Sequence, residues 1–147
     1  MGVIEAVCIS EKKGMVKKEA PEIVLKENWG IVGDAHAGDW HRQVSLLAAE
    51  SIEQVKKKMP NLKHGVFAEN IVCRGVALTS LAIGDRLLID GKVVLEVTQI
   101  GKECHNAGCA IKKATGDCIM PREGIFTKVL HGGRVKPGLT IEVEGKI

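Results

Sequence analysis

The sequence has almost no aromatic side chains. Tyrosine is absent, and phenylalanine and tryptophan together make up only 3% of the 147 residues. Proteins that bind single-stranded nucleic acid stack bases on aromatic rings, so this scarcity argues against a nucleic-acid partner. The formal net charge of +3 is also too small to indicate nucleic-acid binding, although it suits a small anionic ligand.

Long apolar runs are missing as well. None reaches the roughly 18–20 residues that cross a bilayer, and the N-terminal residues lack the basic-then-apolar order of a signal peptide. We therefore expect a cytoplasmic protein with no membrane partner. In that compartment the five cysteines are expected to be free, metal-bound or catalytic rather than paired in disulfides.

Short apolar segments separated by turn residues predict a mainly β, barrel-like protein. Its 147 residues fit a single domain, residues 1–147, with one aliphatic core. The Asp90-Gly91 pair between two apolar runs is the clearest hairpin signal. The expected strands cover residues 3–9, 22–26, 43–47, 65–74, 86–89, 93–99, 125–130 and 139–143.

One segment, at about residues 48–59, predicts a helix. Ile52 and Val55 begin an apolar face with helical spacing, and Pro60 ends the pattern. Ser45 or the residues just after it are expected to cap the helix.

Two connections carry most of the polar side chains outside the cysteine-rich region. Residues 10–21 are rich in Lys and Glu and are expected to form an exposed loop, with a basic lid over a ligand as the alternative. In residues 29–42, small residues surround Asp34, His36 and Arg42, which favours a binding loop. A turn capped by aspartate is an equally good interpretation.

Glu69 and Asn70 interrupt an expected strand with a carboxyl group and an amide. Buried polar groups need partners, so these two either face a pocket or hold a neighbouring loop. Cys8 and Cys73 are expected to be small buried hydrophobic residues.

The cysteine stretch, residues 101–126, concentrates the remaining chemistry. It contains Cys104, Cys109 and Cys118 in glycine-rich, basic surroundings. Nearby positive charge lowers the pKa of a thiol and favours the reactive thiolate. The neighbouring groups expected to bind an anionic cofactor are Lys102, His105, Lys112 and Arg122.

Several chemistries remain open for this stretch. A zinc site could use three cysteines and His105, but the spacings C-x4-C and C-x8-C differ from the paired C-x2-C of common zinc modules. A redox dithiol lacks its usual C-x-x-C. A single thiolate that ligates a soft metal or carries a persulfide is a third possibility, and three inert buried cysteines are a fourth.

Several segments, in order, resemble the MOSC domain, the molybdenum cofactor sulfurase C-terminal domain. The match covers nearly the whole chain and is closest to the small stand-alone bacterial members. The segments that carry it are residues 33–38 (GDAHAG), 42–47 (RQVSLL), 67–72 (FAENIV), 81–87 (LAIGDRL), 95–98 (LEVT) and 124–138 (GIFTKVLHGGRVKPG).

The resemblance implies a β-barrel with few helices and an association with molybdenum cofactor, a pterin dithiolene with a phosphate. It also implies a cysteine that accepts sulfur as a persulfide or ligates molybdenum. The best match is Cys109, with Cys104 or Cys118 able to resolve the persulfide by thiol exchange. The loop and strand residues expected to line the same pocket are Asp34, His36, Arg42, Glu69 and Asn70.

The expected function is therefore a molybdenum-cofactor-associated sulfur carrier. Its partners would be a sulfur donor protein and the cofactor or a molybdoenzyme, and any sulfurtransferase activity would depend on a partner. The alternatives are a non-catalytic module that delivers molybdenum cofactor or molybdate, and a zinc-stabilised interaction domain. Full-length sulfurases bind pyridoxal phosphate in a further domain for which this sequence has no room, so pyridoxal phosphate is not expected to bind.

Overall fold

A computed structural model describes residues 2–11, 17–58, 60–61, 63–65, 67, 69–100 and 124–144 of the chain. Within these ranges β-strands dominate, as predicted. The strands are β1 (Gly2–Ile9), β2 (Lys18–Ala20), β3 (Ile23–Lys26), β4 (Gly30–Ile31), β5 (Val44–Ala48), β6 (Ile71–Arg74), β7 (Arg86–Ile89), β8 (Val93–Ile100), β9 (Ile125–His131), β10 (Gly133–Val135) and β11 (Thr140–Val143).

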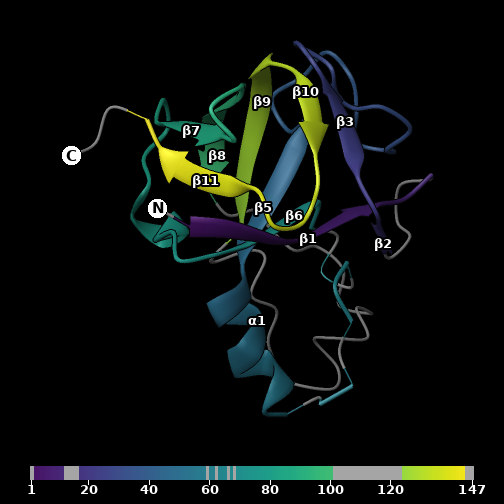
Figure 1. Cartoon of the computed structure of the whole chain (residues 1–147), viewed down its shortest axis with the longest axis vertical. Helices are drawn as coiled ribbons and strands as arrows, with labels where there is room; N and C mark the ends of the chain where they lie inside the picture. The colour runs from purple at the N-terminus through teal and green to yellow at the C-terminus, as the bar shows by residue number, and fades with distance from the viewer. Residues whose placement is uncertain are drawn as a thin grey trace.

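Seven of these strands close into a barrel. They pair in the order β11-β7-β8-β9-β5-β6-β1, and β11 pairs again with β1 (Figure 1). Closure leaves none of the seven as a free edge. The β5–β6 pair is parallel, whereas the other pairs are antiparallel. β2 extends the sheet beside β1, and β10, β3 and β4 form a smaller sheet.

Alternating aliphatic side chains fill the barrel. Leu87, Ile89, Val93, Leu95 and Val97 are buried at alternate positions along β7 and β8, as expected for strands with one face in the core. The turn between these strands has positive φ at Asp90 (53°) and Gly91 (67°). Two consecutive positive φ values are typical of a hairpin turn, so the predicted Asp-Gly turn is confirmed, and the pairing of Ile89 with Val93 includes Lys92 in the loop.

The helix α1 (Ala49–Lys56) continues directly from β5 and projects below the barrel (Figure 1). It is shorter than the predicted 48–59. Ser45 does not cap the helix: the N-cap residue is Ala48, which lies just after it and makes no side-chain hydrogen bond. Ile52 packs with Phe67 and Phe126 in a small cluster at this end of the barrel. A short 3-10 helix, η1 (Leu78–Ser80), precedes β7.

Three predicted connections differ from the structure. Residues 10–21 are not simply an exposed loop, since Ser10 and Lys17 are buried and β2 follows them. Of the described residues in the predicted strand 65–74, those that form a strand are Ile71–Arg74 in β6, so Glu69 and Asn70 precede it. The residues between the expected strands 125–130 and 139–143 include the short strand β10, which pairs with β3.

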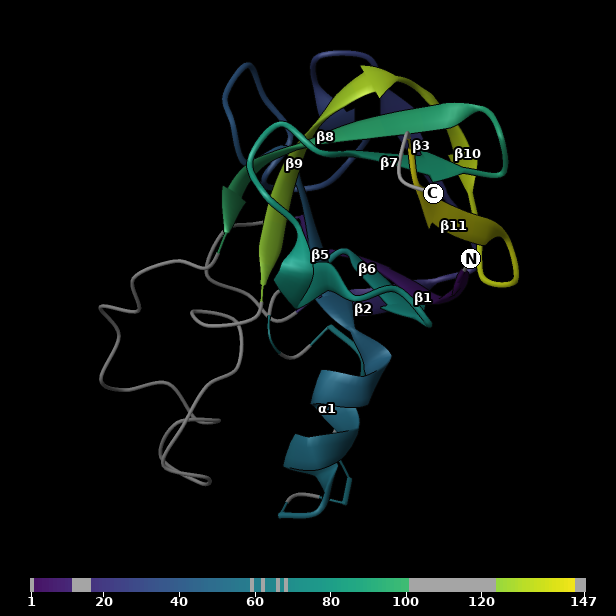
Figure 2. The same cartoon turned by 90° about the vertical axis from the view of Figure 1, so that its left-hand side faces the viewer.

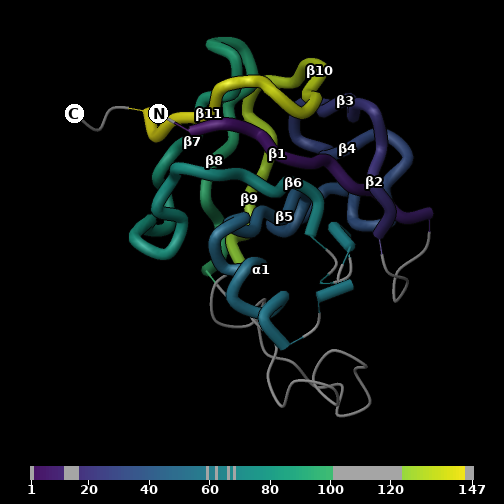
Figure 3. Tube along the Cα trace, turned by 60° about the horizontal axis from the view of Figure 1, so that its bottom comes forward, coloured from purple at the N-terminus to yellow at the C-terminus, as the bar shows by residue number. Residues whose placement is uncertain are grey.

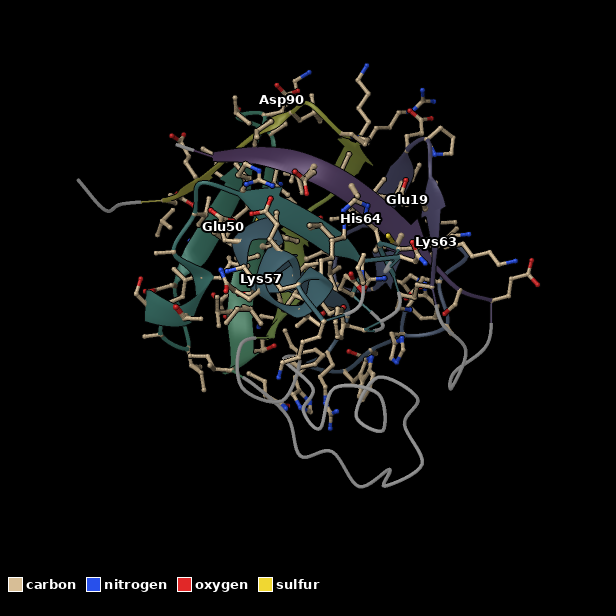
Figure 4. All side chains as sticks on the ribbon, turned by 90° about the horizontal axis from the view of Figure 1, so that it is seen from below. Glu19, Glu50, Lys57, Lys63, His64 and Asp90 are labelled. Atoms are coloured by element: carbon tan, nitrogen blue, oxygen red, sulfur yellow. The ribbon has the colours of Figure 1, made fainter. Side chains whose placement is uncertain are left out.

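The connection between α1 and β6 is attached to the barrel wall by His64. Its Nδ1 contacts the carboxylate of Glu19 on β2, and its Nε2 lies 3.5 Å from Glu5 Oε2 on β1. Figure 4 shows His64 and Glu19 side by side. Within the described ranges, no helix has the length and apolar character that would let it cross a membrane.

Candidate functional site

Asp34 organises the turn that follows β4. Its backbone N–H donates to the carbonyl of Ile31 (3.1 Å). Its Oδ1 accepts from the Ser10 N–H (3.0 Å) and its Oδ2 from the His36 N–H (3.1 Å). Asp34 is buried, and Gly33 supplies the positive φ of 86° that the turn requires. The capped-turn interpretation of this residue therefore describes its local contacts.

Lys17 completes the surroundings of Asp34. Its Nζ lies 2.8 Å from Asp34 Oδ1, 3.1 Å from Ser10 Oγ and 3.0 Å from His36 Nδ1. The side chains of Lys17 and Asp34 are both 0% exposed. Buried charges persist when each is paired and hydrogen-bonded, which holds here. The burial of Lys17 was not predicted from the sequence, because a lysine among other lysines carries no local signal of burial.

The backbone of Lys17 joins this cluster to a second one. Its N–H donates to the carbonyl of Gly65 (2.9 Å). A Cβ on Gly65 would lie 2.1 Å from the Lys17 carbonyl oxygen, and Gly65 has φ of 95°. Only glycine tolerates both the contact and this conformation. Gly65 begins the loop that leads to Glu69.

Glu69 is fully buried, and no ion pair joins it to another described residue. Its Oε1 accepts from the Phe67 N–H (3.0 Å), whereas no described group hydrogen-bonds its Oε2. Burial raises the pKa of this carboxyl, and the nearby backbone N–H groups and His64 lower it by less. Desolvation therefore favours the protonated, uncharged form of Glu69.

Asn70 joins three barrel strands. Its Oδ1 accepts from the Ser45 N–H (2.9 Å) and lies 3.2 Å from the Ser45 hydroxyl. Its Nδ2 donates to the carbonyl of Cys8 (3.1 Å). These contacts link β5 and β1 to the start of β6. Asn70 was predicted either to face a pocket or to hold a neighbouring segment, and its contacts match the second interpretation.

A row of stacked groups runs through the turn after β4. The His36 and Trp40 rings lie 6.5 Å apart at an interplanar angle of 7°. The Arg42 guanidinium lies 5.3 Å from the Trp40 ring and 5.7 Å from the Phe126 ring. Arg42 Nε is buried and has no described hydrogen-bond partner. We call His36, Trp40, Arg42 and Phe126 the stacked row.

The stacked row lies near the points where the cysteine stretch leaves β8 and joins β9. Gln99 pairs with Phe126, and Ile100 pairs with Ile125, so the chain leaves β8 and enters β9 at adjacent points. The Thr98 hydroxyl donates to the His41 carbonyl and lies 3.2 Å from the Phe126 carbonyl oxygen. His41 Nε2 is 2.9 Å from Gln99 Oε1. Figure 2 and Figure 3 show β9 next to both β8 and β5, with which it pairs.

The remaining predicted site residues lie outside the described ranges. They are Cys104, Cys109, Cys118, Lys102, His105, Lys112 and Arg122. Their roles stay predictions, as does the zinc alternative. Among the described residues, no three His, Cys, Asp or Glu side chains are grouped so that they could hold a metal ion.

The two described cysteines are unreactive. Cys8 and Cys73 are both 0% exposed, which confirms that they are buried. Burial raises the pKa of Cys73 to about 12 and raises the pKa of Cys8 further still. Both thiols are therefore protonated at neutral pH, so neither of them supplies a reactive thiolate.

The structure thus brings some of the predicted site residues together and places others apart from them. Asp34, His36 and Arg42 share the turn after β4. Glu69 belongs to the adjoining buried loop, and Asn70 joins strands. Ser10, Lys17, Trp40 and Phe126 are additions that the sequence did not single out. Trp40 was the one with a usable signal, as an aromatic residue in a sequence that has few.

A family model described as the MOSC domain matches residues 33–142. The match begins at the Asp34 turn, so Lys17 precedes it. A search of curated proteins found no match to this sequence.

Solved structures resemble the chain in fold. The YuaD protein of Bacillus subtilis superposes with a TM-score of 0.80 at 23% identity, over 97% of this chain and 96% of that one. YiiM from Geobacillus stearothermophilus gives a TM-score of 0.69 at 14% identity, over 97% of this chain and 75% of that one. YiiM from Escherichia coli gives 0.63 at 15% identity, over 99% and 71%.

Proposed function

Because this chain belongs to the MOSC domain family, which is linked to molybdenum cofactor, we propose that it is a sulfur-carrier module for that cofactor. In this proposal the thiolate of Cys109 carries sulfur as a persulfide. Cys104 and Cys118 are available to resolve it by exchange. A sulfur donor protein loads Cys109, and the cofactor or a molybdoenzyme receives the sulfur.

The observation that carries the proposal is the position of the turn after β4. Thr98 and Gln99 bond this turn to the end of β8, and Arg42 stacks on Phe126 at the start of β9. The cysteine stretch leaves and rejoins the barrel at these points. Groups far apart in the sequence therefore meet at the base of the segment that contains Cys109.

The charges of the described groups suit an anionic ligand. Asp34 is neutralised by Lys17, and burial favours the uncharged form of Glu69. Arg42 keeps its positive charge, and its buried Nε has no described partner. A guanidinium with an unused donor matches phosphate or another oxyanion. These residues fit a cofactor that carries a phosphate.

The loading step conserves atoms and electrons. The Cys109 thiolate attacks the outer sulfur of a donor persulfide, R–S–SH, so that a new S–S bond forms to Cys109. The donor S–S bond breaks, and R–S⁻ leaves as a thiolate. One neutral sulfur atom moves between two thiolates, so no external oxidant is needed. When bound, the cofactor would supply the metal centre that receives this sulfur.

Mass spectrometry tests the proposal. The reduced protein is incubated with a small-molecule persulfide donor, and its intact mass and peptide map are then measured. We expect a gain of one sulfur at Cys109 and loss of that gain in Cys109→Ser. Cys104→Ser and Cys118→Ser are matched controls that keep the primary adduct. Equal loading of Cys109→Ser and wild type would reject the assignment.

A non-catalytic delivery module is the second candidate, and Arg42 favours it. Its stacked guanidinium offers an anion contact that does not require a thiol. Alkylation of all accessible thiols separates the two functions. A delivery module would keep its phosphate-dependent affinity for the pterin, whereas a carrier would lose sulfur transfer.

A further inference from the structure

The contact between Lys17 and His36 constrains the His36 ring. Lys17 Nζ lies within 3.1 Å of Asp34 Oδ1, Ser10 Oγ and His36 Nδ1. An ammonium group has three N–H donors and no acceptor. The three neighbours therefore use all three donors, and His36 Nδ1 must be the acceptor.

Lys17 is in the ammonium form because Asp34 requires it. Both side chains are 0% exposed, and an uncharged amine would leave the carboxylate without a counter-charge. The N–H groups of Ser10 and His36 also donate to Asp34, which favours its ionised form. When Nδ1 of a neutral imidazole accepts a hydrogen bond, its proton resides on Nε2.

We propose that Lys17 is a positioning residue that fixes His36 as the Nε2–H tautomer, so that His36 donates a hydrogen bond to an oxyanion bound at the site. This inference rests on the proposed function. The His36 side chain is 30% exposed, so a ligand can reach it. His36 and Arg42 both belong to the stacked row, and each lies against the Trp40 ring.

The opposite tautomer conflicts with the surroundings of the ring. A proton on Nδ1 would direct one N–H at another across 3.0 Å. It would also remove an acceptor from a fully buried ammonium group, whose remaining neighbours already accept its other two donors. The Lys17 contact therefore selects the tautomer as well as the ring position.

Nitrogen NMR of the full chain tests the tautomer. Long-range proton–nitrogen spectra of protein labelled at its five histidines distinguish a protonated ring nitrogen from an unprotonated one. The His36 signals are assigned by their loss in His36→Gln. We expect an unprotonated Nδ1 and a protonated Nε2 at neutral pH. An Nδ1–H tautomer, or an even mixture, would overturn the proposal.

A charge-neutral double variant tests the role of Lys17. Lys17→Met combined with Asp34→Asn removes both buried charges together, which limits the loss of stability. We expect His36 to show mixed tautomers in this variant. A pure Nε2–H tautomer there would show that Lys17 does not select it, and the positioning role would fail.

Molybdate serves as the oxyanion probe. We expect the His36 Nε2–H resonance of the wild type to shift saturably with molybdate, and not with sodium chloride of equal ionic strength. His36→Gln keeps an N–H donor at a similar reach, whereas the shorter His36→Asn does not. Affinity should fall about tenfold or more in His36→Asn and by less in His36→Gln.

An Nε2–H resonance that ignores molybdate would reject the donor role. So would equal affinities of wild type and His36→Asn. Failure of the carrier function is recognised separately, because Cys109→Ser loading is read by mass and does not depend on His36.

Discussion

Asp34 and Glu69 are both buried carboxyl groups, yet their surroundings favour opposite charge states. Asp34 faces the Lys17 ammonium at 2.8 Å and accepts further bonds through both of its oxygens. Glu69 has one backbone donor on Oε1 and no described partner on Oε2, and burial raises its pKa. For these two buried carboxyl groups, the ionised form is favoured where a lysine is buried beside the carboxyl, and the uncharged form where burial dominates.

The largest effect on stability is expected from removing the Lys17 cation that pairs with Asp34. Lys17→Met leaves Asp34 ionised and buried without a counter-charge, so we expect a loss of about 3–5 kcal/mol in the free energy of unfolding. Urea denaturation at pH 7 measures it. The control is Lys17→Met with Asp34→Asn, which should recover much of the loss. A single variant as stable as wild type would show that the pair is not energetically coupled.

The second-largest effect is expected in the pH dependence of stability, which distinguishes Glu69 from Asp34. The pKa of Glu69 is raised in the folded protein, so its contribution is fully present below the unfolded value of 4.5 and is lost as pH rises through the folded value. One such group gives a slope of at most about 1.4 kcal/mol per pH unit.

Glu69→Gln should remove that decline, because the amide has no proton to lose. At pH 7 we expect the variant to equal or exceed the wild type by up to about 2 kcal/mol. Urea denaturation at several values between about pH 4 and pH 8 measures the free energy of unfolding of both proteins. The same negative slope in both proteins would assign it to another group.

The smallest effect concerns Arg42, a charged group that lies against two aromatic rings. Arg42→Met keeps apolar contact with Trp40 and Phe126 but removes the cation–π contribution, so we expect a loss of about 1 kcal/mol or less. Arg42→Lys is the matched control that keeps the charge and loses the planar stacking. Thermal unfolding compares the three proteins, and a loss as large as that of Lys17→Met would contradict this ranking.

Much of the fold was predictable from local pattern. Strand alternation placed Leu87, Leu95 and their neighbours in one core, and the Asp90-Gly91 pair marked the turn of the hairpin. Where prediction failed, the information was non-local. β2 and β10 are three residues each and are defined by pairing with β1 and β3, which no short window reveals.

The candidate site divides in the same way. Residue types in the turn after β4 marked Asp34, His36 and Arg42 as a group, and the structure brings them together. Lys17 could not be recognised, because it is one of several lysines in its segment and its burial depends on residues 34 and 65. Asn70 bonds to Ser45 and Cys8, contacts that exist only after three strands have assembled.

The sequence by itself determined a mainly β protein with an aliphatic core, one short helix, and a basic stretch that concentrates three cysteines. Periodicity and composition carry this information, because each segment needs only one apolar face to be committed to the core. Only the tertiary structure decided the surroundings of the two buried carboxyl groups. The charge of a buried group depends on desolvation and on partners from distant segments: Lys17 pairs with Asp34, whereas no ion pair of Glu69 is found among the described residues and burial raises its pKa.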